Sequence, residues 1–257
     1  MGSLAGSAVR ERREPGSAVL PGYERLEGAV PALHPPGMEE RATEVRDLLA
    51  TGTAALAEML TVGPPELEAL LVADDDWLEA PREGERPYPP GLPYLTGAVR
   101  PPALVLPETL SSAFRPRTSA TWPLVVWHEL AHAFLLQRSV PRTPAWLREL
   151  LPQALAAAVA RRTGLLDGHL ARIDAKPGFT VRGLKGPAGP GEQMSFQNLL
   201  LRLGAAALEE FGEGFLRRLA HALWDEDEAV GEERAEELLA DSLGPGGREW
   251  LERRPEF

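Results

Sequence analysis

The clearest pattern in the first part of the chain is helical. Apolar residues between positions 38 and 60 recur near the spacing of a helix, which predicts an amphipathic helix, nicked at Gly52. The preceding segment is rich in Gly, Ala and Pro, and Pro-Gly steps interrupt it at short intervals. We therefore expect residues 1–37 to form a flexible arm and residues 38–257 to form a single domain.

Short segments of β character follow the predicted helix. Residues 67–72 fit either a buried strand or a short helix, and residues 93–97 and 103–107 predict two strands. Pro107 closes the last of these and cannot donate a ladder hydrogen bond, so we expect that strand at a sheet edge. The Asp residues at 74–76 predict a loop or a helix cap rather than a metal site, because adjacent Asp side chains diverge.

Helical patterning begins after Pro123 and continues to the end of the chain. The segments expected as helices are 124–138, 144–162, 195–211, 213–224 and 232–243. A short junction joins the first two, so we expect them to be neighbours in space. The whole pattern predicts an α+β fold, in which a small N-terminal β-sheet precedes a C-terminal helical bundle. Residues 38–122 would form the α/β part with the edge strand, and residues 123–257 the mainly helical part.

Composition narrows the range of partners. The 257 residues include 27 Lys and Arg, 38 Asp and Glu and no Cys, which gives a net charge of −11. Nucleic-acid binding needs clustered basic residues, so we expect no nucleic-acid partner. No apolar run reaches the roughly 20 residues that cross a bilayer, and no signal-peptide pattern is present, so we expect a cytoplasmic protein. Without Cys, only His and carboxylate side chains remain as strong transition-metal ligands.

A histidine-glutamate motif lies within the first predicted C-terminal helix. Residues 128–132 read HExxH, and residues four apart face the same side of a helix. His128 and His132 can therefore present two imidazole nitrogens to one metal ion. Glu129 is turned about 100° further around the helix, beside the ion, where the base for a metal-activated water belongs. The residue counts give only roughly 0.014 chance matches to this motif, so coincidence is a weak explanation.

A second acidic residue strengthens the interpretation as a metal site. Trp146-Leu147-Arg148-Glu149 opens the next predicted helix and puts a carboxylate 17 positions past His132. The two elements together resemble gluzincins, zinc metallopeptidases that include thermolysin-like proteins and zinc aminopeptidases, in which a helix after HExxH supplies a Glu as third zinc ligand. The resemblance implies a zincin-like fold with an active-site helix. It also implies one Zn²⁺ per chain, held by His128, His132 and Glu149 with a fourth position open for water.

The likeness covers residues 67–224 and is specific only between 127 and 149. Upstream, residues 92–107 are similar to the edge-strand region that lines the cleft in such proteins, where backbone hydrogen bonds could hold a peptide. Downstream, residues 150–154 depart from the Gly, small residue and aromatic with which the pattern usually continues. The ordinary alternative for Glu149 is a salt-bridged surface residue.

Stabilisation of the substrate oxyanion is the other point of departure. Gluzincin peptidases generally use a Tyr or His for it, but all 3 tyrosines of this chain lie upstream of the motif. The downstream candidates are His169, His221 and Arg182. For each of them a surface or packing role is the alternative.

Three functions fit these residues. The first is a zinc-dependent hydrolase, a peptidase that acts on a peptide or protein substrate with Glu129 as general base. The second is a non-catalytic zinc-binding relative whose cleft binds a peptide or protein. The missing oxyanion Tyr and the departures after Glu149 favour this second function, and the intact Glu129 opposes it. The third is a site for a non-peptide carbonyl compound, because HExxH specifies activated water rather than an amide substrate.

Overall fold

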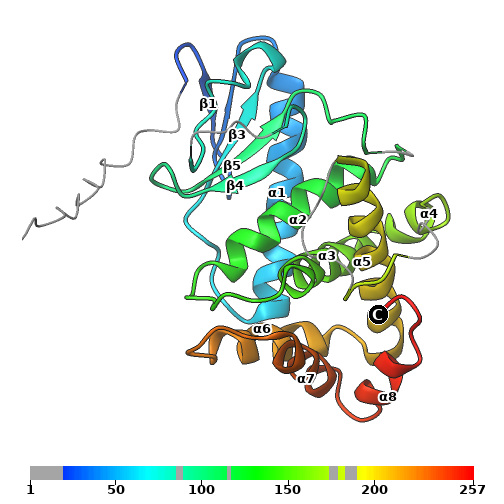
Figure 1. The fold of residues 1–257 in the computed structure, drawn as a ribbon. Coiled ribbons are helices and arrows are strands. Elements are labelled where there is room, and N and C mark those ends of the chain that lie inside the picture. Colours follow the sequence, from blue (N-terminus) through cyan, green and yellow to red (C-terminus); the bar gives the residue numbers. More distant parts are fainter. Residues whose placement is uncertain (1–19, 85–88, 115–116, 174–178, 183–189) are drawn as a thin grey trace, which may run out of the picture.

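The protein has an α+β architecture, with a small sheet at one end and helices throughout the remainder (Figure 1). The computed structural model describes all residues except 1–19, 85–88, 115–116, 174–178 and 183–189. The strands are β1 (Glu24–Leu26), β2 (Ala32–His34), β3 (Glu68–Val72), β4 (Tyr94–Thr96) and β5 (Ala103–Pro107), with a 3₁₀ turn η1 (Asp74–Asp76). The helices are α1 (Glu39–Leu60), α2 (Thr121–Leu135), α3 (Ala145–Arg162), α4 (Leu166–Leu170), α5 (Pro190–Phe211), α6 (Gly214–Trp224), α7 (Glu232–Leu243) and α8 (Gly247–Glu252). The predicted fold class is therefore confirmed.

The sheet has the strand order β1-β2-β3-β5-β4, and its two outer strands run antiparallel to their neighbours. β3 is buried along its whole length, and alternate residues reach opposite faces. Ala69 and Leu71 join the main core with the helices, whereas Leu70 and Val72 join a second cluster beneath the segment around Trp77. Of the two structures that residues 67–72 fitted, the buried strand is the one that forms.

The predicted edge position of the strand that ends at Pro107 was wrong. β5 lies between β3 and β4, so β4 forms the edge on this side of the sheet. Pro107 is tolerated there because the neighbouring N–H of Glu108 donates to the carbonyl of Val72 at 2.8 Å, so the ladder does not need a donor at Pro107. The aspartates at 74–76 form η1, in agreement with their interpretation as a local turn.

The predicted arm was wrong over its second half. β1 and β2 both lie within residues 1–37, and all of β2 is buried. The Pro-Gly steps turn the chain at the strand ends, where Gly22 and Gly37 adopt positive φ angles of 80° and 89°. Tyr23 ties this segment to η1, because its hydroxyl donates to Oδ2 of Asp76 at 2.9 Å. The rest of the expected arm, residues 1–19, lies outside the described residues.

The helix α1 continues through Gly52 without the predicted nick. Gly52 is buried, and a Cβ atom there would lie 2.6 Å from Cδ1 of Trp127 and 2.9 Å from Cδ2 of Leu130. The glycine is therefore needed for the close approach of α2. The indole N–H of Trp127 donates to the carbonyl of Leu48 at 2.9 Å and fixes α2 in rotation against α1.

α3 is the central helix of the domain, and its residues from Leu150 to Ala160 are all buried. It packs between α2 and α5 (Figure 1). Small residues permit this packing, because a Cβ on Gly204 of α5 would lie 2.9 Å from Cα of Ala154. Polar side chains on the facing surfaces of these three helices are consequently brought together.

The five helices predicted after Pro123 correspond to α2, α3, α5, α6 and α7. The short helices α4 and α8 were not predicted as separate elements. None of the helices in the described part of the chain is long and apolar enough to span a membrane.

Candidate metal centre

The two histidines of the motif lie one turn apart on α2 and turn the same ring nitrogen toward a common point. Nε2 of His128 and Nε2 of His132 are 3.2 Å apart, and the ring planes meet at 85°. His128 is buried, with a relative exposure of 7%, because Val126, Trp127 and Leu130 anchor the other sides of α2 in the core. The helix thus fixes both rings by its packing.

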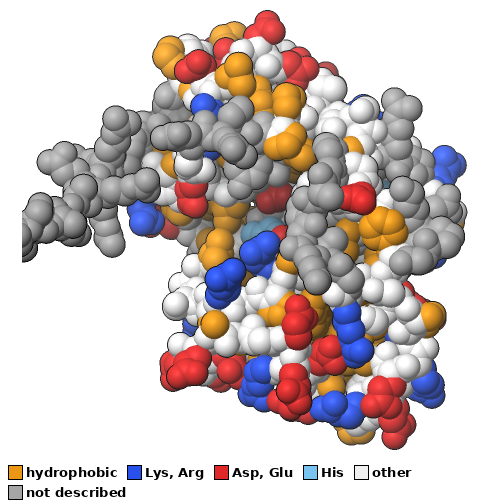
Figure 2. Space-filling model, in the orientation of Figure 1, with side chains coloured by type: hydrophobic (Ala, Val, Ile, Leu, Met, Phe, Trp, Pro, Cys, Tyr) orange, Lys and Arg blue, Asp and Glu red, His pale blue; other side chains and the backbone are white. Residues whose placement is uncertain are grey.

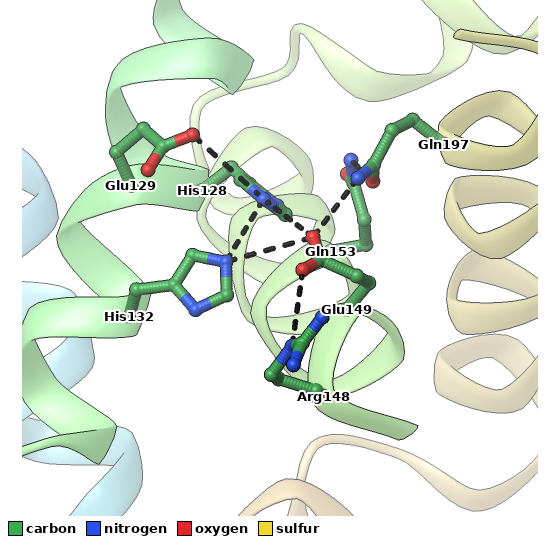
Figure 3. Close-up of polar contacts among 7 residues, drawn as sticks. All are labelled: His128, Glu129, His132, Arg148, Glu149, Gln153 and Gln197. Atoms are coloured by element: carbon green, nitrogen blue, oxygen red, sulfur yellow. Dashed lines mark hydrogen bonds and ion pairs between the residues drawn. The ribbon is translucent and has the colours of Figure 1, made fainter. Parts of the chain in front are cut away.

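Glu149 of α3 completes the group. Its Oε2 lies 3.4 Å from Nε2 of His128 and 3.6 Å from Nε2 of His132 (Figure 3). Zinc bonds of about 2.0–2.1 Å in a tetrahedron put neighbouring ligand atoms about 3.3–3.4 Å apart. The three donor atoms, all within 4.8 Å of one another, therefore suit one ion of that size.

The structure gives only weak support to the alternative interpretation, in which Glu149 forms a surface salt bridge. Nε of Arg148 lies 3.7 Å from Oε1 of Glu149, and the Arg148 side chain is 61% exposed. An ion pair with so exposed a partner contributes little. The other oxygen, Oε2, faces the imidazoles, and the Glu149 side chain is only 22% exposed (Figure 3).

The electrostatics of the group favour a bound cation. Burial alone would raise the pKa of Glu149, but hydrogen bonds and charge from His128 and His132 outweigh it and hold this pKa well below its usual range. Burial alone would lower the pKa of His132, but the hydrogen bond and charge of Glu149 raise it instead. The cluster thus attracts a proton, and by the same attraction would accept a metal ion in its place.

Glu129 lies beside the three donors. Its Oε1 is 4.0 Å from Nε2 of His128, and its carboxylate is not one of the three groups that converge (Figure 3). Burial raises the pKa of Glu129, the imidazoles of His128 and His132 oppose the rise, and Glu149 adds to it. A carboxylate in this position can take a proton from a neighbouring water more readily than an exposed one.

A cleft opens in front of His128 and Glu129. The cleft has an empty volume of about 740 Å³, which includes the solvent-open space at its entrance. The lining is mostly apolar with several amides, and it includes Leu92, Pro93, Phe114, Leu124, Val125, Gln153, Ile173, Gln193, Met194, Gln197, Asn198 and Leu201. In the space-filling view, histidine and acidic side chains are visible between hydrophobic ones in the middle of this face (Figure 2). The expected neighbourhood of an edge strand is present, since Leu92 and Pro93 lead directly into β4.

Of the three downstream candidates for a carbonyl contact, only His169 lines this cleft. His169 is buried, and its Nδ1 is 2.7 Å from Oγ1 of Thr118. Burial lowers the pKa of His169, which favours the neutral ring. His221 lies elsewhere, with Nε2 3.1 Å from the carbonyl of Leu60. Arg182 pairs with Glu236 through Nε at 2.7 Å.

Two residues of the centre were missed from the sequence. Nε2 of Gln197 on α5 donates to Oε2 of Glu149 at 2.9 Å, and Nε2 of Gln153 donates to Oε1 of Gln197 (Figure 3). The four-residue spacing from Glu149 to Gln153 could have indicated that Gln153 lies on the same face of the helix as the ligand. No local pattern indicates Gln197, because α5 reaches α3 only through the tertiary packing.

No tyrosine is among the described residues that line the cleft. The phenol of Tyr94 donates to the carbonyl of Pro81 at 3.1 Å, Tyr23 contacts Asp76, and Tyr88 lies outside the described residues. Comparison of the chain with protein-family models and with curated proteins gives no match.

Proposed function

We propose that the protein is a zinc-dependent hydrolase that cleaves peptide bonds. The observation that carries the proposal is the convergence of His128, His132 and Glu149 on one point, with the uncoordinated carboxylate of Glu129 beside it and facing a cleft. A purely structural zinc site uses four protein ligands and has no need of such a carboxylate. Zinc held there would supply Lewis-acid chemistry, the activation of water and the polarisation of a carbonyl.

Glu129 serves as general base in this proposal. Its carboxylate takes a proton from the attacking water and returns it to the leaving amine. The raised pKa of Glu129 brings its proton affinity closer to that required in both steps. The neighbouring imidazoles limit how far that pKa rises.

His169 is the proposed partner of the carbonyl oxygen. Oγ1 of Thr118 accepts the N–H of Ala120 at 3.2 Å, and in the proposed arrangement its hydroxyl donates to Nδ1 of His169, which lies 2.7 Å away. That arrangement places the ring proton on Nε2, from which a neutral imidazole can donate to an oxygen in the cleft. The apolar lining, with Leu124, Val125 and others, would receive an apolar side chain of the substrate.

The second candidate function is a non-catalytic zinc-binding protein that holds a peptide in the same cleft. It is favoured by the lack of a tyrosine in the described lining. A peptide-library digest read by mass spectrometry separates the two functions. The peptidase should cleave when zinc-loaded, should stop when treated with chelator, and should stay inactive as Glu129→Gln. Zinc binding without peptide cleavage in the wild type would overturn the peptidase and favour the binding function.

A further inference from the structure

The carboxylate of Glu149 is supported from a helix outside the motif. Its Oε2, the oxygen that faces both imidazoles, accepts a hydrogen bond of 2.9 Å from Nε2 of Gln197. Gln197 in turn accepts from Nε2 of Gln153 (Figure 3). Both amides border the cleft, and Gln153 is buried with a relative exposure of 9%. A chain of two amides therefore ends on the third ligand atom.

The direction of this chain is determined by its last member. An ionised carboxylate can only accept, so Gln197 must turn its NH₂ group toward Glu149. The oxygen of Gln197 then faces Gln153, which must donate to it. If Gln197 turned over, its oxygen would oppose a carboxylate oxygen, which is repulsive. Gln153 thus stabilises the one orientation of Gln197 that supports Glu149.

The hydrogen bond that orients Glu149 matters because the imidazole of His128 has no such orienting hydrogen bond among the described residues. Nδ1 of His128 is buried without a hydrogen-bond partner among the described residues. In zinc sites that nitrogen usually donates to a carboxylate or carbonyl, which orients the ring. The neutral amide of Gln197 holds Oε2, the oxygen that faces the imidazoles, without placing a positive charge on it, whereas the guanidinium of Arg148 lies near the other oxygen, Oε1, at 3.7 Å.

We propose that Gln153 and Gln197 are positioning residues of the metal centre, in which Gln197 holds Oε2 of Glu149 in the ligand position and Gln153 fixes the orientation of Gln197. This inference rests on the proposed metal site. The two glutamines act through Glu149 and take no part in the proton transfers.

The sharpest test is Gln153→Glu, an isosteric change. A carboxylate at 153 cannot donate to the oxygen of Gln197 but accepts from its NH₂, so it turns the amide over and presents oxygen to Glu149. We expect affinity for zinc to fall about 10-fold, within the range known for outer-shell partners. If the added negative charge alone mattered, affinity for zinc would rise. An unchanged or tighter affinity in Gln153→Glu would overturn the proposal.

A second variant measures the contact to Glu149 itself. Gln197→Met keeps the length of the side chain and removes the donor, and we expect zinc to bind about 10- to 100-fold more weakly. The double variant Gln153→Met/Gln197→Met should be no weaker than Gln197→Met, because Gln153 acts only through Gln197. Gln193→Met, one turn earlier on α5 and also at the cleft, is the matched control and should bind zinc like the wild type.

The readout is competition for zinc between the metal-free protein and a chelating dye at pH 8, with the absorption spectrum of the Co²⁺ form as a report on ligand geometry. The melting temperature of each metal-free variant shows whether it folds. If Gln197→Met does not fold, Gln153→Glu decides. A wild type that binds no zinc refutes the proposed function itself. If the wild type binds zinc and both Gln153→Glu and Gln197→Met bind it equally tightly, only the role of the glutamines is refuted.

Discussion

Two charged clusters lie at opposite ends of α3, and they differ in how their negative charges are balanced. At the C-terminal end, Arg162 bridges α1 and α6, with Nη1 3.1 Å from Oε2 of Glu58 and Nη2 in contact with Glu213. At the N-terminal end, Glu149 meets His128 and His132. The first cluster contains its own cation. The second has two carboxylates, Glu129 and Glu149, against two imidazoles that carry charge only when protonated and the exposed Arg148, which lies 3.7 Å from Oε1 of Glu149.

The difference separates a structural cluster from a candidate functional one. The hydrogen bonds that Arg162 donates to Glu213 and Glu58 raise its pKa, and its charge is permanent, so this cluster contains its own balancing cation. In the other cluster the pKa of Glu129 is raised by burial while that of Glu149 is lowered by the imidazoles. Opposite shifts suit two neighbouring carboxylates to different roles, which in the proposed function are base and ligand.

The largest effect on the proposed zinc site is expected from Glu149→Ala. We expect zinc affinity to fall by more than about 100-fold, because a ligand is lost rather than an outer-shell partner. The zinc-dependent gain in melting temperature should shrink with it, since that gain follows the affinity. Dye competition and thermal melts with and without zinc measure both effects. Equal zinc affinity in variant and wild type would remove Glu149 from the ligand set.

Glu129→Gln tests the base without disturbing the ligands. Turnover should fall by about 10²- to 10⁴-fold, because a carboxamide cannot accept the proton, whereas zinc content should stay at the wild-type level. Kinetics on a cleaved peptide, with metal analysis of the same sample, give the result. Full activity in a variant with normal zinc would exclude Glu129 as base.

His169→Phe removes the proposed donor to the carbonyl oxygen. We expect a loss of about 10²-fold, mainly in kcat, with zinc affinity unchanged. His169→Gln keeps an N–H donor and should retain more turnover than His169→Phe. If both variants lose kcat equally, the donor is not what matters, and a packing role for His169 is the better explanation.

Arg162→Met probes the self-contained cluster. The unfolding free energy should fall by about 1 kcal/mol, the value expected for half-exposed ion pairs. Zinc affinity should not change, because Arg162 is at the other end of α3 from Glu149. Denaturant melts and dye competition measure the two quantities separately. Weaker zinc binding in this variant would mean that the clusters are coupled through the helix.

The smallest effect is expected away from both clusters, at Tyr23. Burial, together with Asp76, raises the pKa of this phenol from 10.0 to about 12, although the N–H of Ala73 opposes the rise. The folded protein holds the phenolic proton more tightly, so the contribution of Tyr23 is present below pH 10 and is lost as the pH rises from 10 to about 12. Tyr23→Phe should lower the unfolding free energy by about 1 kcal/mol below pH 10.

Denaturant melts of wild type and Tyr23→Phe across that pH range measure the difference, which should narrow as the pH rises. A constant difference would mean that the phenol titrates alike in both states. No difference at any pH would mean that the hydrogen bond from Tyr23 to Asp76 of η1 does not contribute to stability.

The sequence was informative where a regular period or a fixed spacing determined geometry. The four-residue spacing of His128 and His132 places two nitrogens on one face of a helix whatever surrounds it. The short junction before α3 was enough to expect that helix next to α2, and with it Glu149. The apolar periods likewise predicted α1, α3 and the order of sheet and helices.

The errors have a common physical cause in tertiary packing. Gly52 was interpreted by its low helix propensity, but its lack of a side chain is used to admit Trp127. The segment around β1 and β2 was interpreted from its prolines and glycines, although these residues only turn the chain at the ends of the two strands, of which β2 is buried. Gln197 carries no local pattern and reaches Glu149 only because α5 packs on α3.

The central claim is that His128, His132 and Glu149 bind one zinc ion. Elemental mass spectrometry of the dialysed wild-type protein, beside the variant His128→Ala/His132→Ala, tests it most directly. We predict one zinc per chain in the wild type and almost none in the variant. A wild type without zinc, or a variant that keeps it, would contradict the account.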